Sequence, residues 1–255
     1  MQTALSSTMA PADRFVGVEA RKTIALKFAD GFVQRYLSGS NILDIGYKGY
    51  ISDVVPIVPQ ATGIDLDYPG YDGRTLPFAD ASQDAVYSSH CLEHIADYRQ
   101  AIGEWFRVVK PGGYLIIVVP HQFLYEKRSG LPSRWNEDHK RFYTPGSLMT
   151  EVEQSLRPNT YRLRQLADND LDYNYAIGPT QHAGGCYEIE LVVQKLAPPH
   201  WELEPPPPAP LIPRRSPTRA LYYFVGTRLP EPIKVVLRPL VRWLHGSKEP
   251  VSNRA

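Results

Sequence analysis

Apolar and polar positions alternate along residues 41–119 in a pattern that predicts strands separated by helices. Short apolar runs bounded by turn residues recur between stretches whose apolar positions have helical spacing. We expect, in chain order, a strand at 41–45, a helix near 50–57, strands at 61–65 and 84–88, a helix at 92–109 and a strand at 113–119. Strands that alternate with helices over short loops predict an α/β fold with a doubly wound, mostly parallel sheet.

The segments on either side of this alternation follow other patterns. Residues 13–37 place apolar residues at roughly helical spacing, which predicts one or two amphipathic helices after a disordered start at 1–12. Residues 121–146 are aromatic and charged with little periodicity, as in a long active-site loop. We expect the domain to end with a short helix and then an antiparallel pair of strands, at 148–156, 161–167 and 187–196.

A proline-rich segment separates this predicted domain from the C-terminal part of the chain. Repeated prolines favour a stiff polyproline-type spacer, and the part beyond it interleaves aliphatic and aromatic residues with Lys and Arg. The pattern over residues 218–246 is typical of an interfacial membrane element, and equally of a helix pair that docks on a partner subunit. The predicted parts are a disordered N-terminus, one α/β domain, a linker and a basic amphipathic tail, at 1–12, 13–197, 198–217 and 218–255.

Composition narrows the class of partner and the compartment. The formal net charge is +1, so no global field favours nucleic acid, and we expect none as a partner. Cys91 and Cys186 have no CxxC spacing and are too few for a disulfide framework or a zinc cluster. Residues 1–11 lack the pattern of a signal peptide, and no segment reaches the roughly 20 apolar residues of a spanning helix. We therefore expect a cytoplasmic protein, peripheral at the inner face of the membrane if the tail is interfacial.

The first predicted strand ends in an acid and a turn that contains glycine. Asp44 precedes Gly46 and Gly49, and ligands of doubly wound sheets lie beyond the carboxyl ends of the strands. Asp65 ends the next strand, nineteen positions after Gly46, where an acid typically holds ribose hydroxyls. A tight strand-to-helix turn and a helix-capping Asp are the structural alternatives. A dinucleotide site is disfavoured because Lys48 stands where G-x-G-x-x-G requires glycine.

Two longer blocks resemble a known family. The first runs from Leu76-Pro-Phe78 to Leu92-Glu-His94, and the second runs from Arg107 through Lys110-Pro-Gly-Gly113 to Pro120. With the glycine turn, they resemble class I S-adenosylmethionine-dependent methyltransferases of the ubiquinone/menaquinone-biosynthesis type (methyltransferase type 11-like). The resemblance is strong over residues 38–122 and looser over the rest of the core. It implies a Rossmann-like sheet of the seven-stranded type, S-adenosyl-L-methionine as cofactor and methyl transfer as activity.

The resemblance also implies roles, position by position. The turn after Asp44 would frame the methionine end of the cofactor, Asp65 would hold the ribose, and Asp72 would recognise the adenine amino group. The end of the strand at 84–88 would face the methyl group. The implied cofactor-binding residues are Asp44, Gly46, Tyr47, Lys48, Gly49, Asp65, Asp72, Ser88, Ser89 and His90. Lys110–Gly113 is expected to be a structural turn, and Glu93 and His94 are expected to pack rather than to catalyse.

The first turn departs from the family's usual D-x-G-x-G-x-G. Lys48 and Tyr50 replace the second and third glycines. We expect the change to be tolerated, because S-adenosylmethionine has no phosphate that needs the tightest backbone cradle. Lys48 is also a candidate partner for the carboxylate of the cofactor. The altered turn keeps an alternative open, a methyltransferase-like protein that binds cofactor or a partner without catalysis.

Histidines are the candidate bases for methyl transfer. The sulfonium already activates the methyl group, so the protein has to align an acceptor and, for a hydroxyl, remove its proton. His139, His121 and His90 are the candidates, and His182 could reach the same face. Nearby aromatic residues could stack on a sugar or an aromatic ring, or simply anchor the loop: Tyr125, Trp135, Phe142 and Tyr143.

The sequence leaves the acceptor class broad. We expect methylation at oxygen on a small molecule or a glycan, with a cell-envelope sugar as one option by analogy with bacterial methyltransferases of this general type. We predict no metal site. Glu137, Asp138 and His139 are adjacent, but three consecutive side chains rarely converge on one ion.

Overall fold

The computed structural model describes residues 15–17, 21–48, 53–185, 187–201 and 203–206, and also 224, 228, 230, 232–235, 237 and 239. The chain divides into two compact units, Met1–His200 and Trp201–Ala255. The predicted disordered start at 1–12 and most of the predicted tail lie outside the described residues. In the part of the chain that the structure describes, no helix is both long and apolar enough to cross a membrane.

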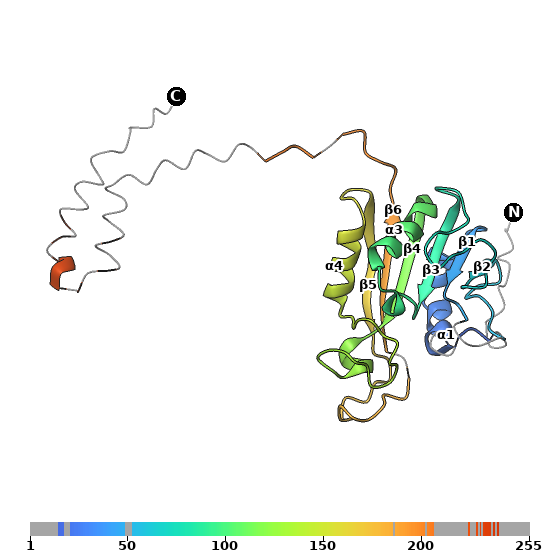
Figure 1. Ribbon diagram of the computed structural model, residues 1–255, viewed down its shortest axis with the longest axis horizontal. Coiled ribbons are helices and arrows are strands. Elements are labelled where there is room, and N and C mark those ends of the chain that lie inside the picture. Colours follow the sequence, from blue (N-terminus) through green and yellow to red (C-terminus); the bar gives the residue numbers. More distant parts are fainter. Residues whose placement is uncertain are drawn as a thin grey trace, which may run out of the picture. The chain divides into compact units, whose positions relative to one another are not determined.

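A six-stranded sheet forms the centre of the first unit, in the order β2-β1-β3-β4-β6-β5 (Figure 1). Its first four strands pair in parallel, and β6 runs antiparallel between β4 and β5. The strands are β1 (Ile42–Ile45), β2 (Ala61–Ile64), β3 (Gln83–Ser89), β4 (Val109–Pro120), β5 (Tyr161–Asn169) and β6 (Glu188–Lys195). The predicted α/β fold with a mostly parallel sheet and a final antiparallel pair is confirmed. The described residues supply six strands where the family pattern implied seven.

Helices cover both faces of the sheet, as a doubly wound fold requires. On one face α1 (Arg21–Ala29) and α2 (Phe32–Tyr36) bury Ile24 and Phe32 against Ile42 and Ile116. On the other, α3 (Tyr98–Val108) and α4 (Pro145–Ser155) bury Trp105 and Leu148 against Leu43 and Ile117. All four residues of β1 are buried, which is why the central strands are apolar runs rather than alternating patterns.

The predicted helix near 50–57 is wrong over its described part, because residues 53–60 form turns and irregular structure. Proline lacks an N–H donor and disfavours helix in the residue before it, and Pro56 and Pro59 both fall in this stretch. The Ile57 N–H donates to the buried Asp44 carboxylate at 2.6 Å instead of to a helical carbonyl. A side chain at the end of β1 therefore takes the hydrogen bond that a helix would have used.

The predicted helix at 92–109 is divided into two elements. A short 3-10 helix, η2 (Leu92–His94), is followed by α3, which Asp97 caps by accepting a hydrogen bond from the Gln100 N–H at 3.1 Å. An Asp at this position satisfies a donor that the first helical turn leaves open. The loop predicted at 121–146 is irregular except for one helical turn, η3 (Gln122–Glu126), a bridge between His121 and Tyr143, and the first two residues of α4.

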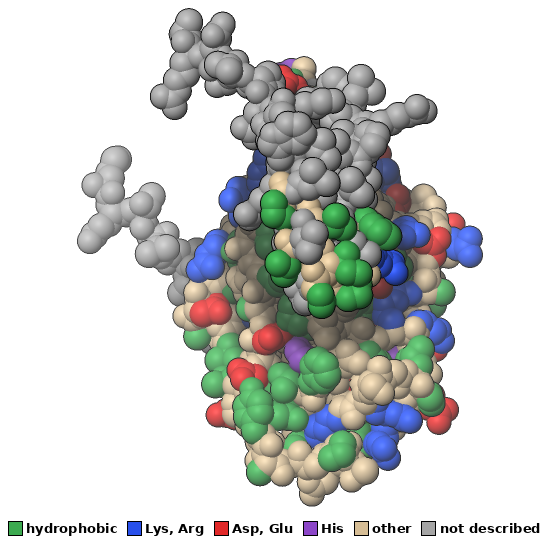
Figure 2. All heavy atoms as spheres, turned by 90° about the vertical axis from the view of Figure 1, so that its left-hand side faces the viewer, with side chains coloured by type: hydrophobic (Ala, Val, Ile, Leu, Met, Phe, Trp, Pro, Cys, Tyr) green, Lys and Arg blue, Asp and Glu red, His purple; other side chains and the backbone are tan. Residues whose placement is uncertain are grey.

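Charges of both signs are mixed on the surface. On the face shown in Figure 2, Lys and Arg side chains are interspersed with Asp, Glu and hydrophobic side chains. This agrees with a net charge of +1, and such a face offers no continuous field to a polyanion. The expectation that nucleic acid is not a partner stays a prediction.

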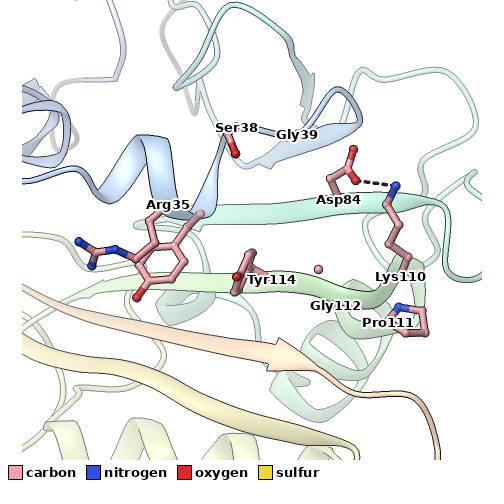
Figure 3. A pocket seen from close by; sticks show the side chains of 10 residues that line it. Arg35, Ser38, Gly39, Asp84, Lys110, Pro111, Gly112 and Tyr114 are labelled. Atoms are coloured by element: carbon pink, nitrogen blue, oxygen red, sulfur yellow. Dashed lines mark ion pairs between the residues drawn. The ribbon is translucent and has the colours of Figure 1, made fainter. Parts of the chain in front are cut away.

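The Lys110-Pro-Gly-Gly113 block lies at the amino ends of the parallel strands, beside a shallow pocket of about 260 Å³ (Figure 3). Lys110 Nζ pairs with Asp84 Oδ1 at 2.5 Å, and Asp84 Oδ2 accepts hydrogen bonds from the N–H groups of Ser40 and Asn41. A Cβ on Gly113 would come within 2.5 Å of the Asp84 carbonyl oxygen. These contacts join β3, β4 and the start of β1. The block therefore has contacts of a structural kind, but it forms the irregular first part of β4 rather than the separate turn that was expected.

Candidate active site

The predicted cofactor residues meet at the opposite edge, where β1, β2 and β3 end. Ile45 pairs with Ile64 of β2 and with Ser88 of β3. Because the strands are parallel and in this register, Gly46, Asp65 and Ser89 come next at the same edge of the sheet. The structure thus brings together three segments that are far apart in the sequence.

Gly46 makes the first turn possible. Its φ is +72°, in the region that favours glycine, and its N–H donates to the Ile64 carbonyl at 2.8 Å. A Cβ there would lie 2.6 Å from Cys91 Sγ. The side chain of Tyr47 packs over Gly63, and a Cβ added to that glycine would lie 2.6 Å from the tyrosine ring. Gly49 and Tyr50 lie outside the described residues.

Asp65 presents one buried oxygen toward this edge. Its Oδ1 accepts a hydrogen bond from the Leu66 N–H at 2.8 Å, whereas Oδ2 is buried with no hydrogen-bond partner among the described residues. A buried acceptor without a donor costs free energy. Ribose hydroxyls are donors of the kind that would satisfy it, so the chemistry of Asp65 fits the role predicted for it.

Asp44 is buried at the end of β1. Burial raises the pKa of its carboxyl to about 7, although the hydrogen bond from the Ile57 N–H opposes the shift. A positive charge beside this carboxyl would favour its charged form. The amino group at the methionine end of the cofactor carries such a charge.

Two predicted cofactor residues have partners in their own loops. Lys48 Nζ forms an ion pair with Asp67, and Asp72 Oδ1 accepts hydrogen bonds from the N–H groups of Arg74 and Thr75. Those backbone bonds lower the pKa of Asp72. The proposed contacts of Lys48 with the cofactor carboxylate and of Asp72 with adenine stay predictions.

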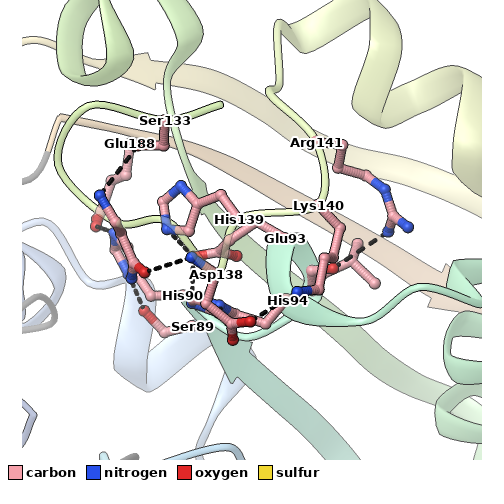
Figure 4. Close-up of polar contacts among 12 residues, drawn as sticks. Ser89, His90, Glu93, His94, Ser133, Asp138, His139, Lys140, Arg141 and Glu188 are labelled. Atoms are coloured by element: carbon pink, nitrogen blue, oxygen red, sulfur yellow. Dashed lines mark hydrogen bonds and ion pairs between the residues drawn. The ribbon is translucent and has the colours of Figure 1, made fainter. Parts of the chain in front are cut away.

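His90 follows β3 and adopts a left-handed backbone, with φ of +51°. Its Nδ1 lies 2.9 Å from Ser89 Oγ, and its Nε2 faces Glu188 Oε2 at 4.0 Å (Figure 4). A non-glycine residue held in this region of φ stores strain, and such residues concentrate at functional sites. Ser89, His90 and Glu188 thus form a line of polar groups at the ligand edge of the sheet.

A buried lysine completes this line. Lys27 of α1 pairs with Glu188 at 2.7 Å and with Glu190 at 2.6 Å, and it donates to Thr23 Oγ1 at 2.8 Å. Burial alone would lower the pKa of Lys27, but the Glu188 carboxylate and its neighbours raise it above the ordinary value. Sequence analysis missed this cluster. The signal was two glutamates on a strand whose other residues are mostly apolar.

His121 is held by the backbone that follows it. Its Nδ1 accepts hydrogen bonds from the N–H groups of Phe123 and Leu124, and its Nε2 lies 3.4 Å from Asp168 Oδ1. Burial lowers its pKa. With Nδ1 accepting from two backbone N–H groups, the ring caps η3, and the role of His121 as a base stays a prediction.

His139 lies in a second polar cluster, next to η2. Its Nδ1 bonds the buried Glu126 carboxylate, and its Nε2 lies 4.0 Å from Glu93 Oε1. His94 Nδ1 lies 3.1 Å from Asp138 Oδ2. Burial and the neighbouring His139 lower the pKa of His94. Glu93 and His94, expected only to pack, therefore face a predicted site residue (Figure 4).

The aromatic residues of the long loop divide into two groups. Tyr143 is buried and its hydroxyl donates to Glu151 at 2.7 Å, so it belongs to the core. The rings of Tyr125 and Trp135 both pack edge-on against His182, at centroid distances of 5.8 and 5.0 Å. His182 thus reaches the cluster around the 121–146 loop. Whether any of these rings stacks on an acceptor stays a prediction.

Comparison with known proteins agrees with this arrangement. Residues 43–117 match the family model described as a methyltransferase domain. A probable S-adenosylmethionine-dependent methyltransferase of Mycolicibacterium smegmatis is 30% identical over 112 residues, which cover 37% of this chain and 44% of that protein. The demethylmenaquinone methyltransferase of Corynebacterium efficiens is 54% identical over 46 residues, covering 18% and 20%. The chain thus spans less than half the length of these curated relatives.

A solved structure also aligns with the chain. It is the Burkholderia thailandensis 1,6-didemethyltoxoflavin-N1-methyltransferase, with bound 1,6-didemethyltoxoflavin and S-adenosylhomocysteine. It covers 69% of this chain and 78% of its own, at 13% identity and a TM-score of 0.46.

The sheet, the glycine turn and the matched segment together define a class I S-adenosylmethionine-dependent methyltransferase domain. The chain carries such a domain over residues 43–117, part of which is similar to demethylmenaquinone methyltransferases. The cofactor that this class of domain uses is S-adenosyl-L-methionine. The residues that would hold the cofactor are Asp65 at the ribose and Asp44, Gly46 and the end of β3 at the methionine. The buried oxygen of Asp65 and the raised pKa of Asp44 fit that group.

Proposed function

We propose that this protein transfers a methyl group from S-adenosylmethionine to a hydroxyl oxygen of a small molecule or a glycan, with His90 as the proton acceptor. One observation carries the proposal: His90 stands at the end of β3, between Ser89 Oγ at 2.9 Å and the Glu188 carboxylate at 4.0 Å. Of the three histidines predicted as bases, it is the one on the strand end that the family resemblance places at the transferring methyl.

The cofactor supplies a methyl group that its sulfonium has already activated. The protein has to hold the acceptor oxygen in line with that group and take up the hydroxyl proton as the oxygen–methyl bond forms. For His90 Nδ1 to accept the proton, the acceptor hydroxyl has to replace Ser89 Oγ, which lies 2.9 Å from that nitrogen. Glu188 then stabilises the imidazolium that forms, since a nearby carboxylate favours the protonated ring.

The proposal is tested with His90→Gln, which keeps side-chain length and polarity but removes the basic nitrogen. Incubation with methyl-labelled S-adenosylmethionine and small-molecule or glycan extracts, followed by mass spectrometry, identifies a product. We expect the variant to lose about 100-fold or more in turnover while its Kd for S-adenosylhomocysteine changes less than tenfold. Equal turnover in the parent protein and in His90→Gln would show that His90 is not the base. His200→Ala, on an exposed residue, is the matched control.

A second candidate function is binding of cofactor or a partner without catalysis. The observation in its favour is the first turn, where Lys48 replaces a family glycine and pairs with Asp67. Calorimetry with S-adenosylmethionine and S-adenosylhomocysteine shows whether the protein binds either compound. Binding without any labelled product from the extracts supports this candidate over the first.

Residues 218–246 are proposed to contact a membrane surface or a partner subunit, on the sequence pattern alone. Sedimentation with anionic vesicles separates the two, because an interfacial basic segment binds them and is released by salt. If the segment docks on a partner subunit instead, the protein stays in the supernatant.

A further inference from the structure

Three side chains converge beside η2 in a manner that suits a metal ion. Glu93, His94 and His139 each offer one ligand atom, and the three atoms lie within 4.8 Å of one another. Glu93 and His94 follow β3, whereas His139 comes from the long loop. The loop is tied to η2 by hydrogen bonds from the Lys140 N–H to the Glu93 carbonyl and from Arg141 to the Leu92 carbonyl.

The spacing of the ligand atoms is slightly wider than in a loaded site. Glu93 Oε1 lies 3.8 Å from His94 Nε2 and 4.0 Å from His139 Nε2. Ligand atoms bound to one ion at about 2.1 Å lie roughly 3.0–3.5 Å apart. The two distances from Glu93 therefore need to shorten by roughly half an ångström, and the pair of histidine nitrogens, which lies within the same 4.8 Å limit, has to close as well.

The outer nitrogens of both histidines are held by carboxylates. His94 Nδ1 lies 3.1 Å from Asp138 Oδ2, and His139 Nδ1 bonds Glu126, which also accepts a hydrogen bond from Ser133 Oγ at 2.6 Å. Metal-binding histidines characteristically donate the N–H of the other ring nitrogen to a carboxylate, which orients the ring and raises its basicity. Here both rings have that partner, and both turn Nε2 toward the same Glu93 oxygen (Figure 4).

The charges around the cluster favour a cation. Three carboxylates, Glu93, Glu126 and Asp138, surround the two imidazoles, and Lys140 pairs with the outer Asp138 at 2.7 Å. Glu93, Glu126 and His139 are buried. Buried carboxylates in proteins are paired or coordinate metal ions, so the charges present here are compatible with a bound cation.

We propose that Glu93, His94 and His139 bind one divalent transition-metal ion. Two imidazoles and one carboxylate suit Zn²⁺, Fe²⁺, Co²⁺ or Mn²⁺ and leave coordination positions open. The cluster begins three residues after His90. If the proposed function holds, an acceptor oxygen could take an open position, where the ion would lower the pKa of the acceptor hydroxyl before His90 accepts the proton. Metal binding itself does not depend on that function.

Metal binding is measured on the full-length protein after removal of metal with a chelator and dialysis. Titration with Zn²⁺ in a calorimeter should show one equivalent bound, and Co²⁺ should give the visible absorption bands of a low-coordinate protein site. His94→Ala and Glu93→Gln should abolish stoichiometric binding. Asp138→Ala changes an exposed residue and removes only the carboxylate that contacts His94 Nδ1. It should therefore weaken metal binding by about 10–100-fold.

Controls separate the site from adventitious binding and from misfolding. His200→Ala removes an exposed histidine outside the cluster and should bind Zn²⁺ as the unchanged protein does. The folding of each variant is checked by a thermal melt. If His94→Ala or Glu93→Gln fails to fold, the loss of Zn²⁺ affinity in Asp138→Ala tests the site instead. The proposal is overturned if the folded protein binds no stoichiometric Zn²⁺ or Co²⁺, or if the His94 and Asp138 variants bind as tightly as the parent. Zn²⁺ binding with no methylated product would leave the site intact and count only against the proposed function.

Discussion

At the scale of single residues, the cofactor end of the site depends on Asp65. One oxygen of this carboxylate is satisfied by its own loop, and the other is buried with no partner in the described part of the chain. The structure therefore holds an acceptor in place at some cost to its own stability. Groups kept in this condition are typical of binding sites, where the ligand supplies the missing hydrogen bonds.

Asp65→Ala is expected to weaken S-adenosylhomocysteine binding by about 10–100-fold, because hydrogen bonds to a charged acceptor contribute about 1.5–3 kcal/mol. The melting temperature of the free protein should stay the same or rise, since the variant removes a buried unsatisfied oxygen. Calorimetry and a thermal melt measure the two effects. Asp80→Ala, on a carboxylate that contacts Arg107 at the far end of the strands, should leave the affinity unchanged. An unchanged affinity for Asp65→Ala would show that ribose is held elsewhere.

At the scale of elements, α1 is joined to β6 by a buried ion cluster. Lys27 lies between Glu188 and Glu190 and is 2% exposed. The two buried carboxylates and the buried ammonium stabilise each other, because the loss of one partner leaves an uncompensated buried charge. Since Glu188 also faces His90, the same cluster links the packing of α1 to the proposed base.

Lys27→Met should therefore destabilise the protein by about 3–5 kcal/mol, although Met nearly preserves the volume of the side chain. Urea denaturation of the two proteins measures the difference. Lys48→Met removes the exposed ion pair with Asp67 and should cost much less, because solvent screens that pair. If both substitutions have the same small effect, the buried cluster does not stabilise the fold in the way proposed.

At the scale of the whole molecule, the described residues of the site all belong to the first compact unit, Met1–His200. A chain that ends at His200 is therefore expected to bind S-adenosylhomocysteine with the affinity of the full-length protein. Calorimetry on both proteins tests this. A loss of affinity of tenfold or more would assign residues beyond 200 a part in the site.

Much of this fold could be predicted from the chain alone, because its signals are local. The apolar runs at β1, β3 and β4 predicted buried parallel strands, and the alternation near residue 190 predicted the last strand. Asp44, Gly46 and Asp65 followed from the same pattern, since parallel strands bring their carboxyl ends to one edge. The helix expected near 50–57 is absent over its described part, because Pro56 and Pro59 disfavour it and because Ile57 donates to Asp44. Only the second reason depends on where β1 ends.

The rest depended on contacts between distant segments. Lys27 and Glu188 are 161 positions apart, and no periodicity connects them. The sequence pattern presents His139 as a candidate base and places it beside Glu137 and Asp138, where no metal site is expected. The fold places it opposite Glu93 and His94 instead. The sequence by itself determined the class of domain and the cofactor edge, because strand pattern and turn residues act locally. Only the tertiary structure decided which acids and histidines meet, because that depends on how the long loop and α1 pack against the ends of the sheet.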